Sequence, residues 1–317
     1  MSISEEQIIQ ALRVKLGQEP GKIVSITQEE NQEKPHIKSI KITLENSSKI
    51  DLIAKCLTKE FESNEKTVQN FQVESYMYKN VLLSKKLNVP KAYFVSEKEQ
   101  LILMENCLEN GYQVRKPFEK PFSKNEVKGV MKTLAQFHSE TKKYLKNQDV
   151  EKVRKILQKT SWMVRLPNTI QVMKIMVQGA FEISGLKIDP DDFMEKIINL
   201  QNSQGLLETI VQDNLWYGQL LFKSDNCILL DFKMSRVSNP FFDVVNFMAL
   251  NLQYDLRKDW KEFLTCYYSE FTKNYDLEPL TCADFVAEYK KVFKMGFLSG
   301  IQQLHVSNQD LFLTRSR

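Results

Sequence analysis

The chain has 317 residues, of which 42% are hydrophobic and 26% are charged, and its formal net charge is +4. This length suits two lobes with separate apolar cores better than one small domain. Acidic and basic residues alternate without a long run of one sign, so the composition does not indicate a nucleic-acid partner. No stretch approaches about 18 consecutive apolar residues, so we expect no transmembrane helix and no membrane partner.

The cysteines and the N-terminus indicate the compartment. Five cysteines lie far apart, without a C-x-x-C pair. An odd number of separated cysteines is typical of reduced thiols. Glu5 and Glu6 stand where a signal peptide would carry basic residues. We therefore expect a cytoplasmic protein.

The first 108 residues predict one helix followed by a mostly β segment. Ser4 and Gln7 form a capping-box pattern ahead of apolar residues at helical spacing. A later helix is expected over residues 65–83, with Phe71 and Glu74 on one face. Short apolar runs between polar turns predict strands over residues 21–27, 37–44, 50–57, 92–96 and 101–105.

After residue 109 the pattern becomes mostly helical. His138 falls in the apolar stripe of one predicted helix, where a packed core residue is the simplest interpretation. Residues 150–187 show no clear periodicity. Their large apolar side chains, such as Phe181, either line an apolar pocket or form core, and we favour core. Apolar residues at helical spacing predict helices over residues 123–144, 190–203, 244–252, 259–275 and 282–303.

Residues 211–243 hold the most informative pattern. Two short apolar runs around a polar turn predict a β-hairpin at residues 220–230. Asn214 and Gln219 precede this hairpin, and Asp231 ends it. Asp and Asn at strand ends are often ordinary turn formers. Polar side chains that converge at the mouth of a hairpin are also how phosphotransferases hold Mg²⁺ and a nucleotide.

This stretch resembles the catalytic loop and metal-binding segment of the aminoglycoside phosphotransferase and choline kinase superfamily. Within that superfamily it is most similar to the CHK kinase-like group, which includes the ecdysteroid 22-kinase-like proteins. The loop of that group, H-G-D-L-W-x-x-N-x-L-F, aligns without a gap with QDNLWYGQLLF at residues 212–222. The motifs D-F-Q, S-R and P-x-x-D follow in order as DFK at 231–233, SR at 235–236 and PFFD at 240–243.

The resemblance implies an α+β, two-lobed protein-kinase-like fold. Residues 1–108 would form a nucleotide-binding lobe, with an antiparallel β-sheet and one key helix. Residues 109–317 would form a mostly helical lobe with the catalytic-loop hairpin and the acceptor site. In such folds a strand lysine, here Lys55, contacts the nucleotide phosphates, and a helix glutamate, here Glu74, holds that lysine by an ion pair.

The resemblance also implies ATP and Mg²⁺ as cofactors. The segment that contains Glu105 and Cys107 resembles the hinge of the family, whose backbone binds adenine. Asp231 matches the aspartate that binds Mg²⁺, and Gln219 stands where the family has its metal-binding Asn. Asp243 matches the aspartate that braces the catalytic loop in relatives.

The catalytic loop departs from the family pattern, because H-G-D has become Gln212-Asp213-Asn214. The carboxamide of Asn214 cannot take a proton near neutral pH. General-base catalysis contributes roughly 10²–10⁴-fold to a rate, so we expect a slow enzyme or none. Asp213 would serve as the base if the loop shifted by one residue. We expect Gln212 to be unable to replace the missing histidine, and Gln219 to reach a metal only with altered geometry.

Two functions from different classes therefore remain open. The first is a small-molecule kinase that transfers the γ-phosphoryl group of ATP to a hydroxyl acceptor, with impaired catalysis. The second is a pseudokinase that binds a nucleotide or ligand and acts on a protein partner without turnover. An unrelated α+β protein is a third interpretation, and the shared order of motifs from Lys55 to Asp243 counts against it.

Overall fold

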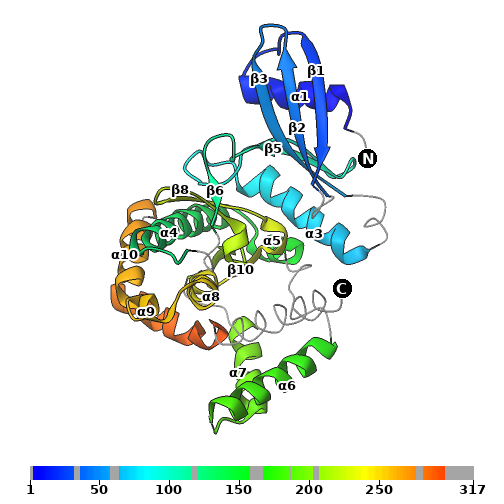
Figure 1. The fold of residues 1–317 in the computed structure, drawn as a ribbon. Coiled ribbons are helices and arrows are strands. Elements are labelled where there is room, and N and C mark those ends of the chain that lie inside the picture. The colour runs from blue at the N-terminus through cyan, green and yellow to red at the C-terminus, as the bar shows by residue number, and fades with distance from the viewer. Residues whose placement is uncertain are drawn as a thin grey trace, which may run out of the picture.

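The computed structural model describes residues 3–31, 36–57, 64–115, 120–157, 167–185, 187–202, 207–275 and 281–296. It is a mixed α+β structure with an antiparallel sheet in the N-terminal part and a mostly helical C-terminal part (Figure 1). The N-terminal elements are α1 (Glu5–Leu16), β1 (Ile23–Glu30), β2 (Ile37–Leu44), β3 (Lys49–Cys56), α3 (Glu65–Tyr76), the π-helical turn η1 (Met77–Val81), β4 (Ala92–Ser96) and β5 (Leu101–Glu105).

The N-terminal sheet has the strand order β1-β2-β3-β5-β4, and all its pairs are antiparallel. Side chains alternate between its faces with a period of two residues. Leu52 and Ala54 of β3 therefore join the core that contains the buried face of α1. Ile53 packs against the core that contains α3. The same alternation puts Lys55 on the α3 face of the sheet.

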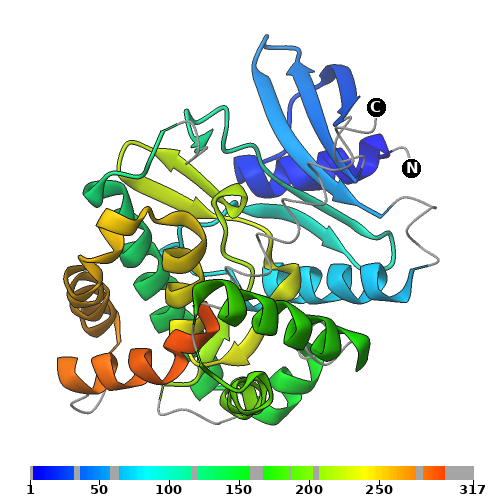
Figure 2. The ribbon, with the colours of Figure 1, turned by 60° about the horizontal axis from the view of Figure 1, so that its bottom comes forward.

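The C-terminal part surrounds the long helix α4, which lies against α10, β7 and β9 (Figure 2). Its elements are β6 (Gln113–Val114), α4 (Lys124–Lys146), α5 (Val150–Leu157), α6 (Pro167–Ser184), α7 (Pro190–Asn202), β7 (Thr209–Val211), η3 (Tyr217–Gln219), β8 (Leu220–Lys223), β9 (Asn226–Leu229), η4 (Phe232–Met234), β10 (Arg236–Ser238), α8 (Phe241–Asn251), α9 (Tyr254–Arg257), α10 (Trp260–Asn274) and a helix over residues 282–296.

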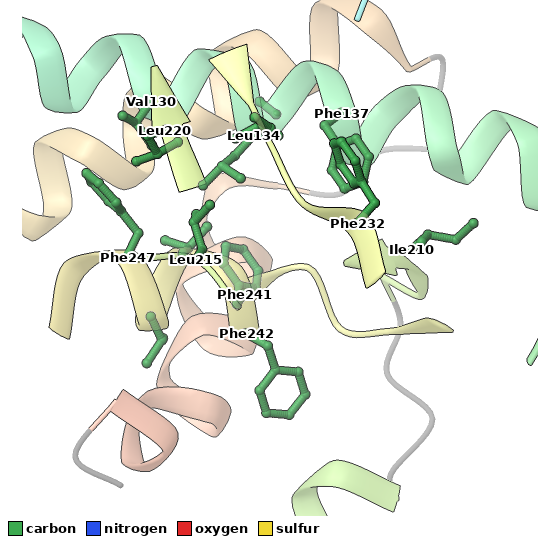
Figure 3. Close-up of a cluster of buried hydrophobic side chains, with 14 of the residues drawn as sticks. Val130, Leu134, Phe137, Ile210, Leu215, Leu220, Phe232, Phe241, Phe242 and Phe247 are labelled. Atoms are coloured by element: carbon green, nitrogen blue, oxygen red, sulfur yellow. The ribbon is translucent and has the colours of Figure 1, made fainter. Parts of the chain in front are cut away.

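Phe232 connects the two parts of the molecule. Its ring packs beside Phe137 of α4, with the ring centroids 5.6 Å apart (Figure 3). It also meets the ring of Tyr78 in η1 edge-on at 5.9 Å. Burying one phenylalanine side chain contributes about 2–3 kcal/mol. This contact fixes the segment immediately after the β8–β9 hairpin between α3 and α4, and so sets the position of Asp231.

The predicted strands and long helices lie within a few residues of their expected bounds. The sequence did not indicate the β7–β10 pair, β6, or the helices α5 and α6. Phe181 of α6 is buried against Phe193, as expected for a core residue. Residues 297–303 of the last predicted helix lie outside the described residues. Within the described part of the chain, no helix is both long and apolar enough to cross a bilayer.

Candidate functional site

The β8–β9 hairpin brings Gln219 next to Asp231. Leu220 pairs with Leu229 across the hairpin, and the Leu230 N–H donates to the Gln219 carbonyl at 2.9 Å. The side-chain amide of Gln219 then donates to Asp231 Oδ2 at 3.1 Å. Asp231 has left-handed backbone angles, φ 60° and ψ 74°. Such a conformation costs about 1–3 kcal/mol in a non-glycine residue and is frequent at functional sites.

Lys55 forms two ion pairs, one with α3 and one with the C-terminal part. Its ammonium Nζ lies 2.5 Å from Glu74 Oε2 on α3 and 2.9 Å from Asp231 Oδ1. The exposed side-chain fraction is 14% for Lys55, 2% for Glu74 and 12% for Asp231. The structure therefore brings together three residues that are up to 176 positions apart in the sequence.

The three groups perturb one another strongly. Burial alone would raise the pKa of Asp231, but the charges of Lys55 and Lys233 outweigh burial and hold that pKa well below its usual range. Burial alone would lower the pKa of Lys55, but Asp231 and Glu74 raise it above its usual value. Burial raises the pKa of Glu74, and Lys55 opposes that shift. Lys55 is therefore a fixed cation near neutral pH.

Lys233 is a further member of this cluster that the sequence did not predict. Its Nζ lies 2.8 Å from Asp231 Oδ2, the oxygen that also accepts from Gln219. The signal was visible in the sequence, because D-F-K replaces D-F-Q. A lysine two residues after a carboxylate is most often a solvated surface residue, and for that reason sequence reasoning gave it no role.

Asp243 holds the backbone of the catalytic loop. It is fully buried and accepts from the Gln212 N–H at 2.7 Å and the Asp213 N–H at 2.8 Å. His138 Nε2 donates to the same carboxylate at 3.1 Å, and the hydroxyl of Tyr267 lies 2.9 Å from the other ring nitrogen. His138 is thus a buried support for Asp243.

Asp213 binds Arg236. Arg236 Nε donates to Oδ2 at 2.7 Å and Nη2 donates to Oδ1 at 2.9 Å. Only 3% of the Asp213 side chain and 6% of the Arg236 side chain are exposed. Both carboxylate oxygens therefore contact guanidinium, in the bidentate geometry that binds carboxylates most strongly. Asp213 also has a left-handed φ of 64°.

Gln212 links the catalytic loop to the segment that carries Asp231. Its side-chain amide donates to the carbonyls of Leu230 and Asp231, each at 3.0 Å. Its side-chain oxygen accepts from the Asn214 N–H at 2.7 Å. Sequence reasoning expected Gln212 to be unable to replace the family histidine and did not predict these hydrogen bonds. A buried amide has both a donor and an acceptor to offer, and here Gln212 uses both.

Asn214 is half-buried, and its side-chain amide makes no hydrogen bond with the described residues. Its backbone is fixed by Gln212 and by the Trp216 N–H, which donates to the Asn214 carbonyl at 3.1 Å. The side chain is therefore presented by an ordered backbone. As a neutral carboxamide it can orient a hydroxyl group but cannot remove its proton near neutral pH.

The predicted hinge follows β5. The Glu105 N–H, at the end of β5, donates to the Lys91 carbonyl at 2.9 Å. The Glu105 carboxylate accepts from Asn110 Nδ2 at 2.7 Å. The Cys107 carbonyl accepts from the N–H groups of Asn110 and Tyr112. The Cys107 N–H has no hydrogen-bond partner within the described residues. Burial raises the pKa of the Cys107 thiol to about 12.

The donor set around Asp231 does not suit the Mg²⁺ that the resemblance implies. Mg²⁺ requires oxygen ligands in near-octahedral geometry. Gln219 turns its N–H toward Asp231, whereas a metal ion held between the two side chains would need the amide oxygen on that side. Lys55 contacts Oδ1, and Lys233 contacts Oδ2 beside Gln219, so three of the roughly four acceptor sites of the carboxylate already have a partner. Among the described residues, no group of three or more His, Cys, Asp and Glu side chains is arranged to hold a metal ion.

The chain is similar to known phosphotransferases. The Plasmodium vivax ethanolamine kinase is 15% identical, with a TM-score of 0.52, over 87% of this chain and 74% of that chain. A macrolide 2′-phosphotransferase from Brachybacterium faecium is 12% identical, with a TM-score of 0.46, over 96% and 94% of the two chains. The likeness to ethanolamine kinase shows a protein-kinase-like phosphotransferase fold. Among curated protein sequences, none matches this chain.

The family itself is shown by sequence. The model of the ecdysteroid kinase-like family matches residues 25–278. The match begins in the N-terminal sheet, includes Lys55, Glu74, Asn214 and Asp231, and ends after α10. Because it spans most of the chain, the protein belongs to the ecdysteroid kinase-like family, a family of kinase-like phosphotransferases.

Proposed function

We propose that the protein binds ATP at the Lys55 cluster, which consists of Lys55, Glu74, Asp231 and Lys233. It transfers the γ-phosphoryl group of ATP slowly to a hydroxyl group of a small molecule. The observation that carries this proposal is the position of Lys55 Nζ, 2.5 Å from Glu74 and 2.9 Å from Asp231. In kinase-like folds, the lysine–glutamate ion pair and the aspartate must all be in place before phosphates can be bound productively.

The hinge supports adenine binding next to this cluster. The N–H of Cys107 is available for an acceptor nitrogen of adenine, since it has no partner among the described residues. The carbonyl of Glu105 lies two residues earlier, at the end of β5. We take residues 1–108 as the nucleotide lobe and residues 109–317 as the lobe that receives the acceptor.

Slow transfer follows from the catalytic loop. Asn214 stands at the position of the family aspartate and cannot accept the proton of an acceptor hydroxyl. Asp213, the nearest carboxylate along the chain, has both oxygens bonded to Arg236. Removing Asp213 from that pair would leave a buried guanidinium unpaired, at a cost of about 3–5 kcal/mol. This cost weighs against Asp213 as the general base.

Binding of ATP to Lys55→Ala tests the proposal. We expect calorimetry to detect ATP binding by the wild type in at least one of two buffers, one with Mg²⁺ and one with EDTA. The variant should bind ATP at least about tenfold more weakly. One charge-assisted hydrogen bond is worth about that much. Lys41→Ala is a matched control, because Lys41 is also a strand lysine paired with a glutamate, Glu29, at 2.9 Å, but at an exposed site. Equal ATP affinity of wild type and Lys55→Ala would remove Lys55 from the site.

A second function has its own support. A protein that binds ATP without turnover, and acts on a protein partner, is favoured by the combination of Asn214 and the Lys233 contact with Asp231. ADP release over hours at saturating ATP, in the presence of small alcohols and amino alcohols such as ethanolamine, separates the two. Release above the buffer rate supports the slow kinase, and no release supports the binding protein.

A reducing, cytoplasmic location fits the thiols. All five cysteines are free, and the side chains of Cys56, Cys107 and Cys227 are buried. We infer that the protein works in the cytoplasm, on a small-molecule acceptor dissolved there.

A further inference from the structure

Asp231 already has cationic partners on both carboxylate oxygens. Lys55 Nζ lies 2.9 Å from Oδ1, and Lys233 Nζ lies 2.8 Å from Oδ2. Gln219 donates a third bond, to Oδ2, at 3.1 Å. In a metal-dependent phosphotransferase, oxygen atoms of this carboxylate bind the cation that bridges to the phosphates. Here lysine ammonium groups contact the same atoms.

The charges in this cluster balance without a metal ion. Lys55 and Lys233 supply two positive charges, and Glu74 and Asp231 supply two negative ones. If residue 233 were neutral, the remaining three groups would carry one net negative charge, which would attract a divalent cation. A neutral cluster lacks that attraction. A divalent cation would also have to displace Lys233 before it could reach Oδ2 of Asp231.

Lys233 is also accessible to a ligand. Its side chain is 32% exposed, whereas that of Asp231 is 12% exposed. An ammonium group has three N–H donors. Asp231 accepts one of them, and no other ion pair or hydrogen bond of Lys233 occurs within the described residues. The remaining N–H groups of Lys233 can donate hydrogen bonds to a phosphate oxygen that lies next to the Lys55 ammonium.

We propose that Lys233 is a built-in cation that replaces the divalent metal at Asp231 and, together with Lys55, contacts the phosphates of ATP, so that nucleotide binding requires no metal ion. This inference rests on the proposed binding of ATP. It goes beyond that proposal because it assigns the role of the divalent metal ion to Lys233. A family member with a neutral residue at this position would instead bind ATP through a metal ion.

The experiment is an ATP titration by calorimetry in EDTA and in Mg²⁺, for wild type and for three variants. Lys233→Gln introduces the residue of the family D-F-Q motif and removes the charge. Lys233→Arg keeps the charge. Lys258→Gln is the control, because Lys258 forms a 2.9 Å ion pair with Asp255 at an exposed site on a different part of the surface.

We expect wild-type affinity for ATP in EDTA to lie within about threefold of that in Mg²⁺. Lys233→Gln binds ATP at least about tenfold more weakly than the wild type in EDTA, because it loses one charge-assisted hydrogen bond. It regains most of that loss in Mg²⁺, because Asp231 Oδ2 then becomes available to the metal. Lys233→Arg and Lys258→Gln bind ATP like the wild type in EDTA.

Wild-type binding that is at least about tenfold tighter in Mg²⁺ than in EDTA overturns the inference and leaves the proposed ATP binding intact. ATP binding by Lys233→Gln in EDTA that is as tight as that of the wild type also overturns the inference and leaves the proposed ATP binding intact. Absence of wild-type binding in both buffers overturns the inference and the proposed function together. The wild-type comparison requires no variant, so it decides the question even if a substitution impairs folding.

Discussion

Replacing Arg236 with methionine tests what holds the catalytic loop in place. Arg236 donates two bonds to Asp213, at 2.7 and 2.9 Å, and a third to Ser238 Oγ at 2.7 Å. Its guanidinium carbon also lies 4.8 Å from the centre of the Phe242 ring. Methionine fills a similar volume but makes none of these polar contacts, so the carboxylate of Asp213 stays buried and loses its bidentate ion pair with Arg236.

The expected cost is large. Removing one partner of a buried ion pair destabilises a protein by about 3–5 kcal/mol. The lost cation–π contact and the lost hydrogen bond to Ser238 each add roughly 1 kcal/mol. A loss of about 5–7 kcal/mol is a large part of the 5–15 kcal/mol that typically stabilises a domain. The double variant Asp213→Asn/Arg236→Met removes both charges of this ion pair and should recover about 2 kcal/mol or more relative to the additive sum.

Urea unfolding followed by tryptophan fluorescence measures this cycle. All three tryptophans, Trp162, Trp216 and Trp260, lie after residue 109 and report on the C-terminal part. The double variant should also keep ATP binding, because neither residue belongs to the Lys55 cluster. A cost below about 1 kcal/mol for Arg236→Met, or strictly additive single effects, would refute the reasoning and return Asp213 to consideration as the general base.

Three further perturbations address the base, the hairpin and the charge cluster. Asn214→Asp restores a proton acceptor and should raise ADP release in the presence of an acceptor by roughly 10²–10⁴-fold; unchanged release would contradict the ungapped alignment of the loop. At Gly129 an added Cβ would lie 1.8 Å from the Asp225 carbonyl oxygen, so Gly129→Ala should destabilise by about 1–3 kcal/mol. Gly179→Ala, with no atom within 4 Å of the new Cβ, should instead stabilise by about 0.5–1 kcal/mol in urea unfolding. The pKa of Asp231 is lowered in the fold, so its stabilising contribution is present above about pH 4, the unfolded value, and is lost as the pH falls through the lower folded value. The difference in unfolding free energy between wild type and Asp231→Asn should then be constant above about pH 5 and shrink below about pH 4, and a constant difference down to about pH 2 would contradict the assignment.

The regular elements were predictable because local signals agree with burial. The strand that carries Lys55 alternates apolar and polar residues, and α4 begins at the capping box that Ser123 forms with Glu126. The pairing of Lys55 with Glu74 was predicted from the resemblance to kinase-like proteins, and the structure contains that ion pair at 2.5 Å. The strands and helices themselves depend on period and spacing, which a single sequence contains.

Three features of the site were not predictable, because each depends on which side chain meets which atom in three dimensions. Gln212 reaches the carbonyls of Leu230 and Asp231 only after the hairpin has folded back on the loop. Arg236 meets Asp213 because β10 pairs with β7, a two-stranded contact with three residues per strand and little periodicity. Lys233 returns to Asp231 through the 3₁₀ turn η4, whose geometry no local pattern specifies.

These contacts separate the geometry of the catalytic loop from its chemistry. Asp243 fixes the loop backbone, Gln212 ties it to the Asp231 segment, and Arg236 holds Asp213, yet none of these three bonds requires a proton acceptor at residue 214. The backbone of Asn214 is therefore ordered although its side chain has lost the charge of the family aspartate. In the proposed function, ATP binding and phosphoryl transfer therefore depend on different residues. Substitutions at Lys55 or Lys233 should change affinity, and a substitution at Asn214 should change turnover at constant affinity.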